Sequence, residues 1–408
     1  MSKLNDLILQ YCPDGVEYRP LWSLTAWDKR FNEVEREKQK KVIKYNYLLA
    51  ADLKSYQVDG GDVKLLTTNV SDLYTTSDLA GDILSEGEVV AIPWGGNPIV
   101  QYYKGKFLTA DNRIATSLNI SILNNKFLYY YLLSQMKLIS SFYRGSGIKH
   151  PEMAKVLELS IPVPPLPVQE EIVRILDNFS LLSAELEAEL EAELEGRRKQ
   201  YDFYRNRLLS FDSDSDSVQW KTLGEIGKVC MCKRILKDQT STTGDVPFFK
   251  IGTFGKEPDA YISNELFQEY KSKYSYPKVG DILISASGTI GRTVIFDGKP
   301  SYFQDSNIVW LNHDESIVLN SYLRYCYTLN PWKVSTGGTI SRLYNDNILN
   351  AVIPIPPLAE QQRIVDILDR FDTLTNDLTQ GLPAEIEARK KQYEHYRNQL
   401  LTFKRKEV

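Results

Sequence analysis

Cysteine and histidine are scarce in this sequence. The 408 residues include four cysteines and three histidines, at Cys12, Cys230, Cys232, Cys326, His150, His313 and His395. Cys230 and Cys232 lack the spacing of a zinc site and no second pair accompanies them, so we expect isolated reduced thiols. Metal centres rich in histidine and hydrolase triads find little support in so small a set.

Long apolar stretches are also missing. The densest run, residues 127–133, has seven residues, whereas a membrane-spanning helix needs about 20. Asn5 and Asp6 stand where a signal peptide would be apolar, so we expect a cytoplasmic protein. The hydrophobic content of 42% is enough for real cores, and the length predicts two or three domains.

No large segment of the chain is basic. Lys plus Arg against Asp plus Glu is 19 to 18 in residues 1–160, 6 to 10 in 161–211, 15 to 16 in 212–352 and 9 to 9 in 353–408. Domains that bind nucleic acid usually carry a positive excess. If this chain binds DNA, it should bind weakly alone and need a partner that supplies positive charge.

Motifs for catalysis and nucleotide binding are absent. Residues 287–293 resemble a phosphate-binding loop only superficially, because Arg292 stands near the lysine position and the glycine spacing fails. The sequence has no Gly-x-Gly-x-x-Gly and no Asn/Asp-Pro-Pro-Tyr/Phe motif of amino-methyltransferases. These absences give no support to an active site, a metal site or a cofactor in this chain.

One stretch of the sequence occurs twice. Residues 161–211 return without a gap as residues 353–403, and by direct count 28 of the 51 aligned positions are identical. The period of 192 residues is far too long for a solenoid, so one module of roughly domain size has been duplicated.

Each copy begins with Pro-rich extended chain and continues as a helix. Apolar residues three or four apart over roughly 44 residues predict a helix of about 65 Å in the first copy. A narrow apolar stripe on so long a helix needs a partner, and the second copy is the obvious one, which predicts a coiled coil. The alternative is two unrelated amphipathic helices that pack on their own domains.

Residues 184–195 are three tandem copies of Ala-Glu-Leu-Glu. Such repetition of strong helix formers indicates a spacer that sets a length, whereas the alternative is an ordinary solvated helix surface. The aligned residues 376–387 contain Gly381, Leu382 and Pro383, which should kink or break the second helix.

The two remaining regions share turn residues rather than sequence. Glycines predict turns between short strands, including hairpin turns at Gly105 and Gly298. Lead-in strands are expected at residues 16–21 and 218–223, a short helix at 2–11, and one clear helix in each region at 126–143 and 316–329. This mixture predicts an α+β fold. The predicted segments are residues 1–160, 161–211, 212–352 and 353–408.

Polar and basic side chains surround glycine loops in both variable regions. Side chains of these types contact the base edges and phosphates of DNA. The candidate DNA-binding residues are Gly95, Gly96, Asn97, Arg144, Lys149 and His150 in the first region, and Ser287, Thr289, Arg292, Lys333, Thr336, Ser341 and Arg342 in the second. Plain hairpin turns without a binding role are the alternative.

The chain resembles a specificity subunit of a type I restriction–modification system. The resemblance rests on the duplicated Pro-rich strand and helix, on CPDGVEY at residues 12–18, on KTLGEIGKV at 221–229, and on GDILIS with GTIG within 280–291. It covers nearly the whole chain. The first region departs from it, with IPWGG at residues 92–96 where the second has SGTIG.

The resemblance implies two pseudo-symmetric mixed α/β target-recognition domains, separated by two long helices that form an antiparallel coiled coil. Each domain would recognise one half of a bipartite double-stranded DNA sequence, while the helices would set the spacing and hold two modification subunits. Those subunits would bind S-adenosylmethionine and methylate adenine, and restriction subunits would cut DNA with ATP and Mg²⁺. The alternative is a non-enzymatic coiled-coil scaffold with two protein- or glycan-binding domains.

Overall fold

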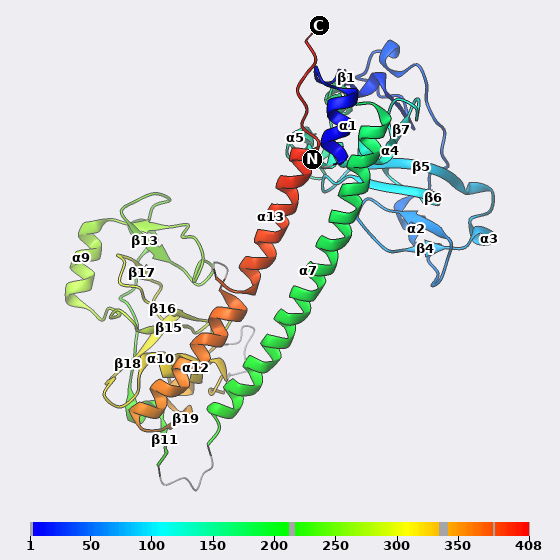
Figure 1. Cartoon of the computed structure of the whole chain (residues 1–408). Coiled ribbons are helices and arrows are strands. Elements are labelled where there is room, and N and C mark those ends of the chain that lie inside the picture. The colour runs from blue at the N-terminus through cyan, green and yellow to red at the C-terminus, as the bar shows by residue number, and fades with distance from the viewer. Residues whose placement is uncertain (1–2, 212–216, 334–341, 378–379, 408) are drawn as a thin grey trace. The chain divides into compact units, whose positions relative to one another are not determined.

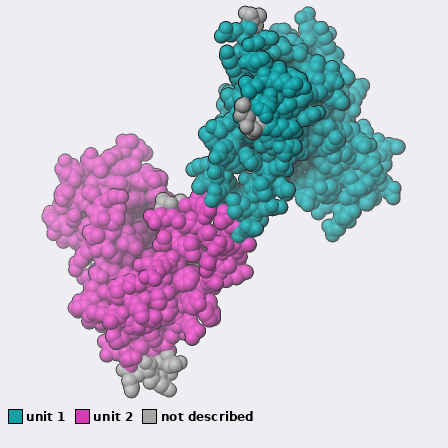
Figure 2. All heavy atoms as spheres, in the orientation of Figure 1, with its two compact units in different colours: residues 1–189, 386–408 teal, residues 190–385 magenta. Residues whose placement is uncertain are grey.

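The chain forms two compact units. The computed structural model describes residues 3–211, 217–333, 342–377 and 380–407. The first unit comprises residues 1–189 and 386–408, and the second comprises residues 190–385 (Figure 2). Each unit contains one variable region and parts of the repeated helices (Figure 1). No helix in the described part of the chain has both the length and the apolar character of a bilayer span.

A six-stranded sheet of order β2-β7-β5-β6-β3-β4 forms the middle of the first unit. Its strands are β2 (Thr25–Trp27), β3 (Val63–Leu66), β4 (Tyr74–Thr75), β5 (Ser85–Pro93), β6 (Gln101–Thr109) and β7 (Asn112–Ser117). Neighbouring strands are antiparallel, except β3 and β6, which are parallel. Residues 89–92 of β5 are all buried, because this strand is covered on both faces.

Gly105 lies inside β6, so the hairpin turn predicted there is wrong. It pairs with Gly87 of β5, and its φ of 139° is one that glycine adopts readily. A Cβ at this position would lie 3.3 Å from the Tyr103 hydroxyl. Glycine within a strand often marks such a close approach, and the sequence pattern does not separate this case from a turn.

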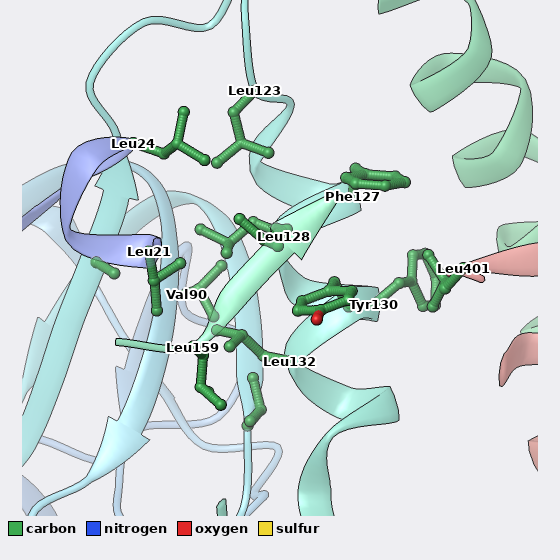
Figure 3. Packing of buried hydrophobic residues seen from close by; sticks show 14 of the residues in the cluster. Leu21, Leu24, Val90, Leu123, Phe127, Leu128, Tyr130, Leu132, Leu159 and Leu401 are labelled. Atoms are coloured by element: carbon green, nitrogen blue, oxygen red, sulfur yellow. The ribbon is translucent and has the colours of Figure 1, made fainter. Parts of the chain in front are cut away.

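Helix α4 (Asn125–Ser134) packs against this sheet. The Asn124 side chain caps it by accepting hydrogen bonds from the Lys126 and Phe127 amides, at 2.8 and 3.0 Å. Figure 3 shows part of the core, in which Phe127, Leu128 and the strand residue Val90 are fully buried. The helix predicted over residues 126–143 is interrupted at Gln135 and continues as α5 (Met136–Ser141).

The N-terminal helix α1 (Lys3–Tyr11) confirms the short helix predicted there. The first unit also contains the short α-helices α2 (Ala50–Ser55), α3 (Ser77–Ala80) and α6 (Met153–Leu157).

The second unit has two smaller sheets, of order β12-β18-β15-β16 and β14-β13-β17. Their strands are β12 (Gly227–Cys230), β13 (Val246–Phe249), β14 (Tyr261–Ile262), β15 (Ile282–Ser285), β16 (Thr293–Ile295), β17 (Tyr302–Phe303) and β18 (Ile308–His313). Helices α8 (Leu223–Ile226), α9 (Asn264–Lys273), α10 (Asn320–Thr328) and α11 (Asn345–Leu349) accompany them. Helix α10 confirms the helix predicted at residues 316–329, although it begins only at Asn320. Gly298 lies in a bend, but the following strand β17 pairs in parallel with β13, so the predicted hairpin is wrong.

Each lead-in strand pairs with the Pro-rich strand that comes after its own variable region. In the first unit β1 (Tyr18–Pro20) is antiparallel to β10 (Ser160–Pro162), and in the second β11 (Gln219–Thr222) is antiparallel to β19 (Val352–Ile355). The two variable regions are thus closed in the same way.

The long helices match the repeat. Helix α7 (Leu166–Leu208) has 43 residues, which confirms the predicted length. The second copy forms α12 (Leu358–Asn376) and α13 (Leu382–Leu400), which confirms the break predicted near Gly381 and Pro383. A Cβ at Gly381 would lie 2.5 Å from the Thr373 carbonyl oxygen, so glycine is required where the chain turns.

The repeated helices pair antiparallel within each unit. In the first unit the ring of Phe179 in α7 lies 6.2 Å from that of Tyr396 in α13. In the second unit Phe371 of α12 stacks on Tyr204 of α7 at 5.5 Å. Phe179 and Phe371 are equivalent positions of the repeat, as are Tyr204 and Tyr396. Each unit therefore combines the first part of one repeat with the last part of the other. Each compact unit thus contains helix residues from both copies of the repeat. Each of the four predicted segments, by contrast, is one continuous stretch of the sequence.

A buried glutamine fastens each long helix to its variable region. Gln169 Nε2 donates to the carbonyl oxygens of Ile122 and Pro164, both at 2.7 Å, and its Oε1 accepts from the Asn124 amide at 2.9 Å. In the second unit Gln361 makes the corresponding bonds to Ile317, Pro356 and Leu319. The duplication therefore extends to individual hydrogen bonds.

Candidate nucleic-acid interface

In the first unit the glycine loop at residues 94–97 lies against the hairpin of β8 (Tyr143–Arg144) and β9 (His150–Pro151). The Gly96 amide donates to the Lys149 carbonyl at 3.1 Å. His150 Nδ1 lies 2.7 Å from the Trp94 carbonyl oxygen, and because a carbonyl only accepts, Nδ1 is the donor of this hydrogen bond. A Cβ on Gly95 would lie 2.9 Å from Ile148 and 3.1 Å from the His150 ring, so the close approach requires glycine.

The structure brings most of the first set of candidates together. Arg144, Lys149, His150 and the exposed Gly96 and Asn97 all belong to the joined loop and hairpin. The glycines therefore shape the contact between two segments about 50 residues apart in sequence, and they are more than turn residues. Whether these residues touch DNA stays a prediction.

The charge of Arg144 is partly neutralised. Its Nε lies 2.8 Å from Glu152, which also pairs with Lys155. The hydrogen bond from Lys155, with Arg144 nearby, holds the pKa of Glu152 below its ordinary value. The side chain of Arg144 is 63% exposed, so it can still exchange this carboxylate for another anion.

Arg113 and Trp94 form a contact that sequence analysis missed. The Arg113 guanidinium lies 4.0 Å from the centroid of the Trp94 ring, and His150 covers the same ring at 5.4 Å. Arg113 is almost fully buried, and this burial lowers its pKa, although nearby Asp28 opposes the shift.

Asp28, also buried, accepts hydrogen bonds from the Tyr47 hydroxyl and the Ile114 amide. Burial raises the pKa of Asp28 in turn.

A hollow of about 430 Å³ opens beside this contact. Four segments that are distant in sequence line it. They contribute Lys29, Arg30, Phe31, Asn32, Glu33, Trp94, Arg113, Arg144, His150, Pro151, Glu152, Met153 and Ala154. Residues 29–33 were not among the sequence candidates, because the charge counted over residues 1–160 hides a local cluster.

In the second unit the glycine loop joins β15 to β16. Ser287 Oγ donates to Asn307 Oδ1 at 2.8 Å, which brings the loop against the turn before β18. Arg292 Nη1 donates to the Phe254 carbonyl at 3.0 Å, and its Nη2 lies 3.5 Å from Thr289 Oγ1. The structure thus places Ser287, Thr289 and Arg292 in one loop, and the Arg292 guanidinium also holds the loop that contains Phe254.

Arg342 lies next to the same turn. Its Nη2 donates to the Ser306 carbonyl at 2.9 Å, and the Leu343 amide donates to Ala286 at 2.8 Å. Lys333 is exposed and comes directly after Trp332, whose ring lies 3.1 Å from where a Cβ of Gly291 would be. Thr336 and Ser341 lie outside the described residues. Arg342 therefore contributes to the shape of the site whether or not it also contacts a base.

The thiols and acids of the described residues offer no metal site. No group of three His, Cys, Asp or Glu side chains with ligand geometry occurs there. The four cysteines are unpaired thiols, and burial raises the pKa of Cys232 and of Cys326 to about 12. Such thiols stay protonated near neutral pH, which makes them poor ligands and nucleophiles.

Known proteins share this architecture. The family model described as "Type I restriction modification DNA specificity domain" matches residues 35–196 and 216–388. A putative type I restriction enzyme specificity subunit of Haemophilus influenzae is 56% identical over 327 residues, covering 78% of this chain and 83% of the relative. The EcoR124I/EcoR124II specificity subunit of Escherichia coli is 35% identical over 307 residues, covering 69% and 72%.

Solved structures support the fold. A chain from a structural study of complex assembly and conformational transition of the type I R-M system matches with a TM-score of 0.59 and 17% identity, covering 95% of this chain and 98% of that one. The HsdS subunit from Thermoanaerobacter tengcongensis gives a TM-score of 0.50 and 16% identity, with 96% of each chain covered. These matches confirm the predicted α+β fold with repeated domains and long helices. The chain belongs to the family of type I restriction–modification DNA specificity subunits.

Proposed function

We propose that this chain recognises a bipartite double-stranded DNA sequence, with one half assigned to each unit. The supporting observation is that the two units have the same plan. Each has a variable region closed by a lead-in strand, fastened by a buried glutamine and joined to an antiparallel helix pair. The same strand pair, buried glutamine and helix pair hold two variable regions with different loops, which suits the recognition of two different half-sites. The alternative of a protein- or glycan-binding scaffold is not favoured, because the family match covers both variable regions.

The helices would set the spacing of the half-sites and hold two modification subunits. A chain with an internal pseudo-twofold repeat suits two identical partners. The whole chain is slightly acidic, with a formal charge of −4, so much of the attraction for DNA phosphates would come from those partners. Restriction subunits would complete the assembly.

Chemistry would belong to the partner subunits. S-adenosylmethionine would bind to the modification subunits, and ATP and Mg²⁺ to the restriction subunits. The specificity chain would supply recognition and geometry without a catalytic group.

The test is to express the chain with its modification subunits and to map methylated adenines across a bacterial genome. We expect one motif of two short specific halves separated by a nonspecific gap of fixed length. Exchange of residues 212–352 for the equivalent region of a relative should replace one half and keep the other. A continuous motif, or loss of both halves after the exchange, would contradict the proposal.

A further inference from the structure

A preorganised loop borders the hollow of the first unit. Gln39 is buried and closes the loop, since its Oε1 accepts from the Phe31 amide at 2.8 Å and its Nε2 donates to the Lys29 carbonyl at 3.0 Å. Phe31 anchors the loop in the core, with its ring edge-on to Trp27 at 5.9 Å. The backbone of residues 29–33 is therefore fixed before any ligand binds.

The loop begins the main basic stretch of this variable region. Residues 29–44 carry seven Lys or Arg against three Asp or Glu, which leaves 12 against 15 in the rest of residues 1–160. Lys38 is already paired with Glu158 at 2.8 Å. Lys29 and Arg30, by contrast, are exposed and make no ion pair with any described residue. Lys29 lies 4.6 Å from the centroid of the Tyr47 ring.

These two cations face the sequence-predicted site. They line the same hollow as Arg144 and His150, which belong to the hairpin that meets the glycine loop. The hollow thus joins Lys29 and Arg30 to the hairpin of predicted DNA-contacting residues in one concave surface. A rim with unpaired cations on a fixed loop suits phosphate oxygens, which are held by charge and carry no sequence information.

We infer that Lys29 and Arg30 bind phosphates of the DNA at the first half-site, across the hollow from the glycine loop. This inference rests on the proposed function and adds to it a contact surface outside the sequence-predicted residues. Phosphate contact, rather than base contact, is assigned because Lys29 and Arg30 lie across the hollow from the hairpin and both end in a full positive charge, which Asn32 and Glu33 of the same loop lack.

The test uses the full chain assembled with its modification subunits and DNA that carries the mapped motif. Binding is measured over a range of salt concentrations for wild type, for Lys29→Ala with Arg30→Ala, and for the charge-conserving Lys29→Arg with Arg30→Lys. A matched control, Lys54→Ala with Lys137→Ala, removes the same charge from exposed positions that do not line the hollow. Melting temperatures establish that all variants fold.

The alanine pair should weaken binding and reduce the slope of log affinity against log salt by about 1.8, at roughly 0.9 per phosphate contact. The charge-conserving pair should keep the wild-type slope, the control pair should change it by much less, and the methylated motif should stay the same. An unchanged slope, or an equal loss in the control pair, would overturn the inference. A relaxed first half-site would overturn it too, since the loop would then contact bases. Failure of the wild-type complex to bind its motif would remove the proposed function itself.

Discussion

Gln169 and Gln361 stand one repeat apart in the sequence and make the same three hydrogen bonds, each within its own unit. Gln361 Nε2 donates to Ile317 and Pro356 at 2.9 and 2.8 Å, and its Oε1 accepts from the Leu319 amide at 2.9 Å. Both glutamines are fully buried. The bond to Pro164 or Pro356 lies within the repeat, and the other two reach the loop that leads into α4 or α10. In this way the same residue of each repeat attaches the long helix to its variable region.

Replacement of Gln169 by alanine should destabilise the first unit alone. Three backbone groups lose their partner, and the buried one among them, the Pro164 carbonyl, costs about 1–3 kcal/mol when it is left unsatisfied. Hydrogen exchange followed by mass spectrometry should show faster exchange in peptides from residues 119–128 and 161–175. Gln361→Ala should do the same in the second unit, while the exposed Gln200→Ala serves as control. Equal effects of all three substitutions would show that the glutamines are not structural fasteners.

Glu171 should stabilise the first unit at neutral pH, and this contribution should be lost at low pH. Arg174 donates to this buried carboxylate at 2.6 and 3.0 Å and Lys3 at 2.7 Å. Hydrogen bonds from Arg174 first, and then from Lys3, lower the pKa of Glu171 to about 2. Because the pKa in the folded state is below that in the unfolded chain, the stabilisation is complete above the ordinary pKa of about 4.5 and is lost as the pH falls towards 2.

Glu171→Gln should therefore lower the melting temperature by about 2–4 °C at pH 7. The difference from wild type should shrink steadily below about pH 4.5, because the wild-type carboxylate then takes up a proton. Glu170→Gln, at an exposed neighbouring position, should have little effect at any pH. A difference between wild type and the Glu171 variant that is constant from neutral to acidic pH would argue against an ionised carboxylate as the cause.

The isolated chain should bind DNA weakly, and the complex with two modification subunits tightly and specifically. The physical reason is the net charge of −4, which leaves a basic surface only in local patches. Affinities for cognate and scrambled duplexes, measured at physiological salt with and without the subunits, test this. Nanomolar specific binding by the chain alone would contradict it.

Arg342→Ala should relax the second half-site and leave the first unchanged. Its guanidinium fixes the Ser306 carbonyl, next to the Asn307 side chain that holds Ser287 of the glycine loop. A well-placed contact to a base is worth about 1–3 kcal/mol of discrimination. Methylation mapping of the variant gives the outcome directly. If all sequences were methylated more slowly by the same factor, Arg342 would hold a phosphate or the fold.

The long helices were predictable because their signal is local and periodic. The apolar stripe, the tandem repeats and the break at Gly381 and Pro383 each depend on neighbours in the sequence, so α7, α12 and α13 appear where expected. The resemblance to a known family supplied the antiparallel pairing.

The binding surface was less predictable because it joins segments that are distant in sequence. Lys29 and Arg30 reach the hollow only because β2 pairs with β7, and Trp94 meets Arg113 through the pairing of β5 with β7. The prediction of a turn at Gly105 was wrong for a different reason. Glycine permits both a turn and a close approach inside a strand, and only the opposite strand decides between them.

The central claim is that the helices set the distance between two separate recognition units, and deletion of residues 188–191 tests it most directly. Removing one Ala-Glu-Leu-Glu copy shortens α7 by about 6 Å and rotates the rest of the helix by about 40°, while Leu194 takes the place of the buried Leu190. B-DNA advances about 3.4 Å and turns about 35° per base pair. Genome-wide methylation mapping of the deletion variant should show the same two half-sites with the gap shorter by one base pair, or by two. An unchanged gap at full activity, or altered half-sites, would contradict the account.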